Sequence, residues 1–144
     1  MRKIMIVDDN YLSAEGIEKN IDWEVLNAEI VHICYNGTSA IDAMKKEPVD
    51  LIISDIEMPD LDGISMSRQA LDINPMVKII LISAYDKFEY ARRALLLGAL
   101  DYIEKPLDYA YLIQKVKNAF ALMEREQKNL QLLKQSRPLL IENF

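Results

Sequence analysis

Five short apolar runs, separated by segments of helical length, constrain the fold of this chain more than any other feature. The apolar runs are residues 3–7, 29–33, 50–54, 78–82 and 100–103, and the segments between them include 11–22, 38–46, 64–73 and 87–97. Continuous runs of aliphatic and β-branched residues are typical of strands covered on both faces. The pattern predicts a doubly wound α/β domain with a parallel sheet, and right-handed crossovers restrict its topology to a few choices.

Composition sets the broad class of protein. Hydrophobic residues make up 51% of the 144 residues and charged residues 28%, which is typical of a soluble globular domain with a substantial core. No stretch reaches the roughly 20 apolar residues of a membrane span, and no secretory signal opens the chain. The single cysteine, Cys34, excludes an internal disulfide, so a reducing cytoplasm is the expected location. The net charge of −6 argues against nucleic-acid binding over the whole surface.

The last predicted helix is unusually long. It begins near Asp108 and runs without a breaker to about Gln135, before Pro138. Its apolar residues follow a heptad pattern in which Glu126 is the one polar intruder: Leu112, Val116, Ala119, Met123, Leu130 and Leu133. The pattern outlasts what a five-stranded domain needs to cover, which favours a coiled-coil extension toward a partner or a further domain. The alternative is a long amphipathic helix with a basic solvated face, since residues 115–137 hold six basic and two acidic side chains.

Acidic residues follow two of the predicted strands. Asp8 and Asp9 come directly after the first apolar run, and Asp55 comes after the third. If these two strands are neighbours, the three carboxylates meet at the carboxyl edge of the sheet, where ligands bind in open α/β folds. Two charges 4 Å apart repel by roughly 4 kcal/mol at an effective dielectric near 20, so the cluster favours a bound cation. Oxygen ligands favour Mg²⁺. Taken singly, each acid would more often cap a helix or turn.

Two further strand ends carry polar residues. Ser83 closes the fourth apolar run, and Lys105 follows the fifth, directly before Pro106. A lysine in this position is usually a solvated surface charge. If its side chain points toward the acids, it becomes a fixed cation beside a carboxylate.

These residues, in this order, resemble the receiver domain of bacterial two-component response regulators. The resemblance rests on Asp8-Asp9, Asp55, "MPDLDG" at 58–63, Ser83 and Lys105-Pro106. It covers residues 1–122 and implies a flavodoxin-like sheet with strand order 2-1-3-4-5. Residues 123–144 would then be a helical extension toward a missing output domain.

More narrowly, "DWE" at 22–24 and the stretch 83–106 resemble receivers fused to AraC-type DNA-binding domains. The tail "RPLLIENF" resembles the start of the linker to such a domain, so we expect the chain to be part of a longer regulator. DNA binding by these 144 residues themselves is not expected.

The resemblance assigns a role to each acid. Asp55 would be the phosphoacceptor, receiving a phosphoryl group from a partner histidine kinase. Asp9 and Asp55, with the backbone carbonyl of Glu57, would ligate Mg²⁺, and Asp8 would act mainly through bound water.

The resemblance also assigns roles to three residues at the other strand ends. Lys105 would pair with the phosphoryl oxygens, and Ser83 would donate its hydroxyl to them once Asp55 is modified. Tyr102 would turn inward behind Ser83 as an aromatic switch, although tyrosine is also an ordinary strand residue. Asn10 departs from the family pattern, because many relatives carry glutamate there.

The expected function is a phosphorylation-operated signalling switch and not a turnover enzyme. Its partners would be a histidine kinase and a second copy, bound through the face of the fourth helix, fifth strand and last helix, or through the last helix alone. Alternatives are a haloacid dehalogenase-type phosphatase, a flavodoxin-like cofactor carrier and a degenerate receiver used only for dimerisation. The phosphatase usually has Asp-x-Asp after its first strand, whereas Asp55-Ile56-Glu57 follows the third. The cofactor carrier needs a Ser/Thr/Gly-rich phosphate-binding loop after its first strand, and no such loop follows residues 3–7 here.

Overall fold

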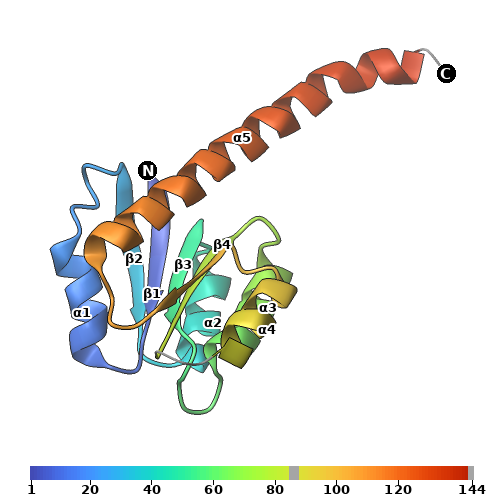
Figure 1. The fold of residues 1–144 in the computed structure, drawn as a ribbon. Helices are drawn as coiled ribbons and strands as arrows, with labels where there is room; N and C mark the ends of the chain where they lie inside the picture. The colour runs from blue at the N-terminus through green and yellow to red at the C-terminus, as the bar shows by residue number, and fades with distance from the viewer. Residues whose placement is uncertain (85–87, 143–144) are drawn as a thin grey trace.

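A five-stranded parallel sheet forms the centre of the molecule. The computed structural model describes residues 1–84 and 88–142. The strands are β1 (Arg2–Val7), β2 (Ala28–Cys34), β3 (Leu51–Asp55), β4 (Lys78–Ser83) and β5 (Asp101–Glu104). Their spatial order is β2-β1-β3-β4-β5, and every neighbouring pair is parallel. The predicted fold and strand order are therefore confirmed (Figure 1).

Helices connect the strands and cover both faces of the sheet. They are α1 (Tyr11–Asn20), α2 (Gly37–Lys46), α3 (Gly63–Ile73), α4 (Phe88–Leu97) and α5 (Tyr109–Glu142). The predicted start of the fourth helix at residue 87 lies outside the described residues. In the first three helices a side-chain oxygen accepts a hydrogen bond from a first-turn amide; these caps are Asn10, Asn36 and Asp62.

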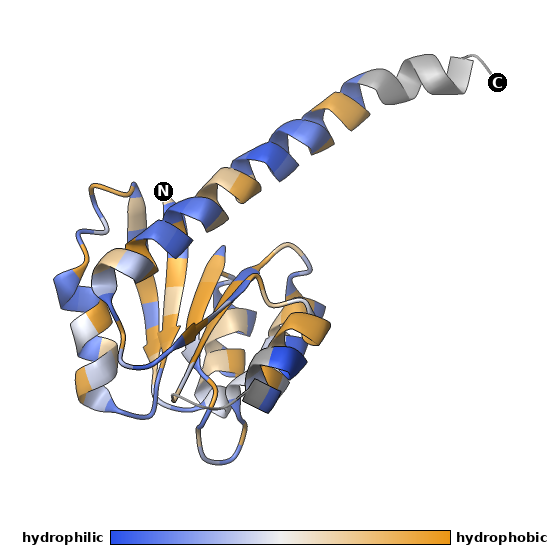
Figure 2. Ribbon diagram, viewed as in Figure 1, coloured by the Kyte–Doolittle hydropathy of each residue, from blue (hydrophilic) through white to orange (hydrophobic). Residues whose placement is uncertain are grey.

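The core has two layers because strand side chains alternate between the faces. In β1, Ile4 and Ile6 pack with residues of α1 and α5, whereas Met5 and Val7 pack with residues of α2, α3 and α4. Successive residues of each apolar run thus alternate between the two layers of the core. Figure 2 shows the central strands β1 and β3 as strongly hydrophobic.

Helix α5 extends well beyond the sheet (Figure 1). The prediction that it ends near Gln135 was wrong, because the helix continues through Pro138 to Glu142. A proline inside a helix removes one backbone hydrogen bond and usually kinks or ends the helix, so the continuation past Pro138 departs from the usual rule. Within residues 1–84 and 88–142, no helix combines the length and apolarity needed to cross a membrane.

The heptad pattern of α5 has two different environments. Leu112, Val116, Ala119 and Met123 are buried in the layer beneath the helix. Leu130, farther along, is 46% exposed. The first half of the pattern is therefore core and is not available for a coiled coil, which corrects the expectation of a single seam over 112–133. Among the six heptad positions, only those beyond Met123 are exposed enough to meet a partner.

Glu126, the polar intruder in the heptad pattern, pairs with the start of β4. Its carboxylate lies 2.8 Å from Nζ of Lys78, and the two side chains are only 31% and 14% exposed. The pair connects α5 to the amino edge of the sheet just where the helix leaves it. Glu126 thus belongs to the contact between helix and sheet.

Candidate functional site at the carboxyl edge of the sheet

Three carboxylates converge at the carboxyl ends of β1 and β3. The two strands are paired in register, with Val7 opposite Ser54, so the residues that follow them are neighbours. Ligand oxygens of Asp8, Asp9 and Asp55 all lie within 4.8 Å of one another. The predicted meeting of these acids is confirmed. Such a group of oxygen donors could hold a metal ion.

Asp8 is the buried member of the first pair. It is 4% exposed, whereas Asp9 is exposed. Burial raises the pKa of Asp8 to about 6, although the backbone N–H of Asn10 donates a 2.9 Å hydrogen bond to its carboxylate. The Asp8 charge is thus disfavoured in the metal-free protein, and a cation would restore it.

Asp55 is buried, and its two oxygens differ. Oδ2 accepts a 3.2 Å hydrogen bond from Nζ of Lys105. Oδ1 is also buried but has no hydrogen-bond partner among residues 1–84 and 88–142. Burial raises the pKa of Asp55, and the charge of Lys105 opposes that rise. A buried carboxylate oxygen without a donor fits a metal ligand, because an unpaired buried polar atom is otherwise costly.

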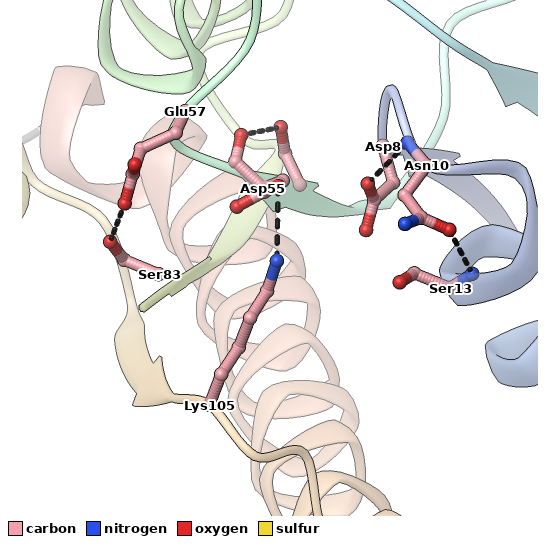
Figure 3. A network of polar contacts seen from close by, with 8 residues as sticks. Asp8, Asn10, Ser13, Asp55, Glu57, Ser83 and Lys105 are labelled. Atoms are coloured by element: carbon pink, nitrogen blue, oxygen red, sulfur yellow. Dashed lines mark hydrogen bonds and ion pairs between the residues drawn. The ribbon is translucent and has the colours of Figure 1, made fainter. Parts of the chain in front are cut away.

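Lys105 enters the site from the end of β5. Its backbone N–H donates a 2.7 Å hydrogen bond to the carbonyl of Ser83, and the peptide bond to Pro106 is cis. Burial lowers the pKa of Lys105, but the charge and hydrogen bond of Asp55 outweigh it, so the net shift is upward. The predicted placement of this cation beside a strand-end carboxylate is confirmed (Figure 3).

Ser83 is fully buried and binds Glu57. Its hydroxyl donates a 3.2 Å hydrogen bond to Oε1 of Glu57, on the side of Asp55 away from Asp8 in Figure 3. The sequence analysis assigned the backbone carbonyl of Glu57 to the metal but did not predict this contact between the Glu57 and Ser83 side chains. Tyr102 is half-buried; burial raises its pKa, and a hydrogen bond with Ser83 opposes that rise.

Gly63 explains part of the "MPDLDG" motif that follows Asp55. A Cβ atom at this position would lie 2.3 Å from the backbone carbonyl oxygen of Asp55. The N–H of Gly63 donates a 2.8 Å hydrogen bond to the carbonyl of Ile56, and Asp62 caps α3 directly before it. The start of α3 therefore packs directly against the backbone of Asp55, which holds that carboxylate at the strand end.

Asn10 has a structural explanation in this site. Its side-chain oxygen accepts a 3.1 Å hydrogen bond from the N–H of Ser13 and so caps α1. Its own N–H binds Asp8 (Figure 3). An asparagine side chain performs this capping without adding a charge to the rim.

An open pocket lies over Asp55. Its lining residues are Asp9, Asn10, Asp55, Glu57, Ala84 and Lys105. Acids, a lysine and a small alanine around a solvent-open space suit a small charged group bound together with a metal ion.

The comparison with protein families agrees with this arrangement. The family model described as the response regulator receiver domain matches residues 4–117. The chain belongs to this family. Receiver domains are signalling domains of two-component systems.

Relatives of this receiver domain include transcriptional regulators. It is 29% identical over 126 residues to the uncharacterized transcriptional regulatory protein YesN of Bacillus subtilis, covering 88% of this chain and 34% of that protein. It is 32% identical over 114 residues to the transcriptional regulatory protein HptR of Staphylococcus aureus, covering 78% of this chain and 44% of that protein. The chain thus spans less than half the length of these curated relatives.

Solved receiver domains have the same fold. The receiver domain of AraT, a response regulator from Geobacillus stearothermophilus, is 34% identical with a TM-score of 0.82, covering 88% of this chain and 98% of that chain. A two-component transcriptional regulator AraC from Clostridium phytofermentans is 30% identical, with the same TM-score and the same coverage of both chains. The similarity to receivers of AraC-type regulators that the sequence indicated is confirmed.

Proposed function

We propose that this receiver domain is a phosphorylation-operated switch in which Asp55 accepts a phosphoryl group from a histidine kinase. The observation that carries the proposal is the environment of one carboxylate. One oxygen of Asp55 accepts a 3.2 Å hydrogen bond from Lys105. The same carboxylate belongs to the cluster that it forms with Asp8 and Asp9. A buried aspartate with a purely structural role would need a charge partner, but it would not need two further acids beside it.

The proposed transfer step would use this geometry. A carboxylate oxygen of Asp55 attacks the phosphorus of a phosphohistidine, and the new O–P bond forms an acyl phosphate. The P–N bond breaks, and its electron pair returns to the imidazole nitrogen, which then takes up a proton. Lys105 would balance negative charge on the phosphoryl oxygens, because phosphoryl transfer depends on positioning and on cations near those oxygens.

Magnesium is the cofactor that the donor set supports. Asp9, Asp55 and the backbone carbonyl of Glu57 would bind it, with Asp8 acting mainly through water. All four supply oxygen, and the unpaired Oδ1 of Asp55 is a buried acceptor for which a metal would be a partner. When bound, Mg²⁺ would neutralise charge on the phosphoryl oxygens.

The response would pass from the site to its surroundings. Ser83 would donate its hydroxyl to the phosphoryl group, and Tyr102 would follow it inward. Residues 1–122 would form the switch, and residues 123–144 would lead to a DNA-binding output domain, as expected for a part of a transcriptional regulator. A cytoplasmic location remains part of this proposal.

A second copy is the proposed partner in the active state. Leu95 and Leu96 of α4 are 62% and 78% exposed, and Leu130 of α5 is 46% exposed, so apolar surface is available on α4 and on the extension. Association would use the α4–β5–α5 face or the exposed end of α5. Sedimentation showing a monomer at high concentration, with and without a phosphoryl mimic, would count against both.

Intact-mass measurement tests the switch. With Mg²⁺ and a small phosphodonor such as acetyl phosphate, the protein should gain one phosphoryl group, and the Asp55→Asn variant should gain none. Asp60→Asn, a change of an exposed acid in the following loop, is the matched control and should label like the wild type. Equal labelling of wild type and Asp55→Asn would contradict the proposal. Sustained hydrolysis of phosphate esters over many turnovers would favour a phosphatase instead.

A further inference from the structure

We propose that Glu57 is a positioning residue whose carboxylate competes with the phosphoryl group for the hydroxyl proton of Ser83. The inference rests on the proposed function. It adds a role for the Glu57 side chain, which would hold the unmodified switch in its resting arrangement.

The resting hydrogen bond defines the competition. The Ser83 hydroxyl donates to Oε1 of Glu57 at 3.2 Å (Figure 3). Serine has one hydroxyl proton, so Ser83 donates to one acceptor at a time. The phosphoryl oxygens and the Glu57 carboxylate are both anionic acceptors for that proton, and a new bond to the phosphoryl group requires the loss of the bond to Glu57.

The surroundings hold Glu57 and Ser83 together. Ser83 is 0% exposed, so water does not readily replace Glu57 as its acceptor. The N–H of Ile56 donates a 2.9 Å hydrogen bond to the carbonyl of Ile82, which fixes the loop after Asp55 against the end of β4. Glu57 and Ser83 each follow one of the residues joined by this backbone bond. This backbone bond therefore keeps the two residues side by side, although Glu57 itself is exposed.

Tyr102 connects this pair to the proposed switch. Tyr102 is partly buried against the core layer under α4, and it is near enough to Ser83 that the serine side chain lowers the Tyr102 pKa against the effect of burial. Ser83 thus donates its proton to Glu57 and also lies near Tyr102. If Ser83 is released from Glu57, its hydroxyl gains a new partner close to Tyr102. This change would link the phosphorylated site to the face of β5.

Binding of beryllofluoride, an anion with the shape of a phosphoryl group, measures the competition directly. In saturating Mg²⁺, removal of the acceptor in Glu57→Ala should tighten beryllofluoride binding by about fivefold, since a hydrogen bond to a charged group is lost from the resting state only. Glu57→Gln, which keeps a neutral acceptor of the same shape, should give an intermediate affinity.

A double-mutant cycle separates the hydrogen bond from simple charge repulsion. In a Ser83→Ala background the effect of Glu57→Ala should fall by about threefold or more, and Ser83→Thr, which restores a hydroxyl, should restore it. Repeating the cycle at about 1 M salt, where screening acts within roughly 3 Å, removes most of the repulsion and should leave the coupling. Any change in metal affinity caused by Glu57→Ala enters both backgrounds and cancels.

Two results would overturn the inference and are distinguishable. If wild type binds beryllofluoride but the effect of Glu57→Ala is the same with and without the Ser83 hydroxyl, Glu57 acts through charge alone and the inference is wrong. If wild type binds no beryllofluoride in Mg²⁺, the proposed function fails, and this inference fails with it.

Discussion

At the scale of single residues, Asp8 carries an energetic conflict that a bound cation would resolve. It is 4% exposed, and burial raises its pKa from 3.8 to about 6 in the metal-free protein. A group whose pKa is higher in the folded state stabilises the fold below its unfolded pKa and loses that contribution as the pH rises through the folded value. Metal-free protein should therefore lose stability between about pH 4 and about pH 7 on account of Asp8.

Replacement of Asp8 by asparagine tests this conflict. Asparagine keeps the shape and still accepts the N–H of Asn10, but it never ionises. In a chelating buffer near neutral pH, Asp8→Asn should raise the free energy of unfolding by about 1–3 kcal/mol, and near pH 4 it should change little. Urea denaturation at both pH values checks this. Added Mg²⁺ should stabilise the wild type more than the variant. A variant less stable than wild type at neutral pH without metal would contradict the argument.

At the scale of elements, the packing of α3 against β3 supports the Asp55 site. Gly63 begins α3, and a Cβ there would lie 2.3 Å from the backbone carbonyl oxygen of Asp55 and 2.9 Å from Cα of Ile56. Both contacts are with backbone, which has little freedom to move. The first turn of α3 and the end of β3 thus depend on glycine at this position.

Gly63→Ala should therefore disturb the site through the backbone. We expect a loss of about 1–3 kcal/mol in the free energy of unfolding, together with slower phosphorylation, because the Asp55 backbone must move away from the new methyl group. Gln69→Ala, an exposed change on the same helix, should stay within about 0.5 kcal/mol of wild type. Thermal unfolding and intact-mass time courses measure both effects. Equal behaviour of the two variants would show that the close contact is unimportant.

A second contact between elements, Lys78 with Glu126, determines where α5 leaves the sheet. Glu126→Gln would leave the largely buried Lys78 without its charged partner, and we expect a loss of about 1–2 kcal/mol in the free energy of unfolding. The matched change Glu124→Gln breaks a pair with Lys128 whose side chains are 66% and 70% exposed, and it should cost little. Denaturant unfolding compares the two. Equal losses would mean that burial of Lys78 has no energetic consequence.

At the scale of the whole molecule, the sequence determines the sheet and the acid cluster but not every contact around them. Five apolar runs suffice to predict a parallel sheet, but its strand order followed only from the resemblance to receiver domains. The acids at two strand ends could be expected to meet only if those strands were neighbours, because parallel strands share one carboxyl edge. The contact of Ser83 with Glu57 spans 26 residues and depends on a loop conformation. That of Lys78 with Glu126 spans 48 residues and depends on where α5 crosses the sheet. Periodicity carries no information on either.

Location of the phosphoryl group tests the central claim most directly. After treatment with acetyl phosphate and Mg²⁺, borohydride reduction converts an aspartyl phosphate to homoserine, and peptide mass spectrometry then identifies the modified position. We predict reduction at Asp55 in most of the labelled protein and at none of the other acids, with loss of the signal in Asp55→Asn. Reduction at Asp8, Asp9 or Glu57 in place of Asp55, or labelling that survives Asp55→Asn, would contradict the account.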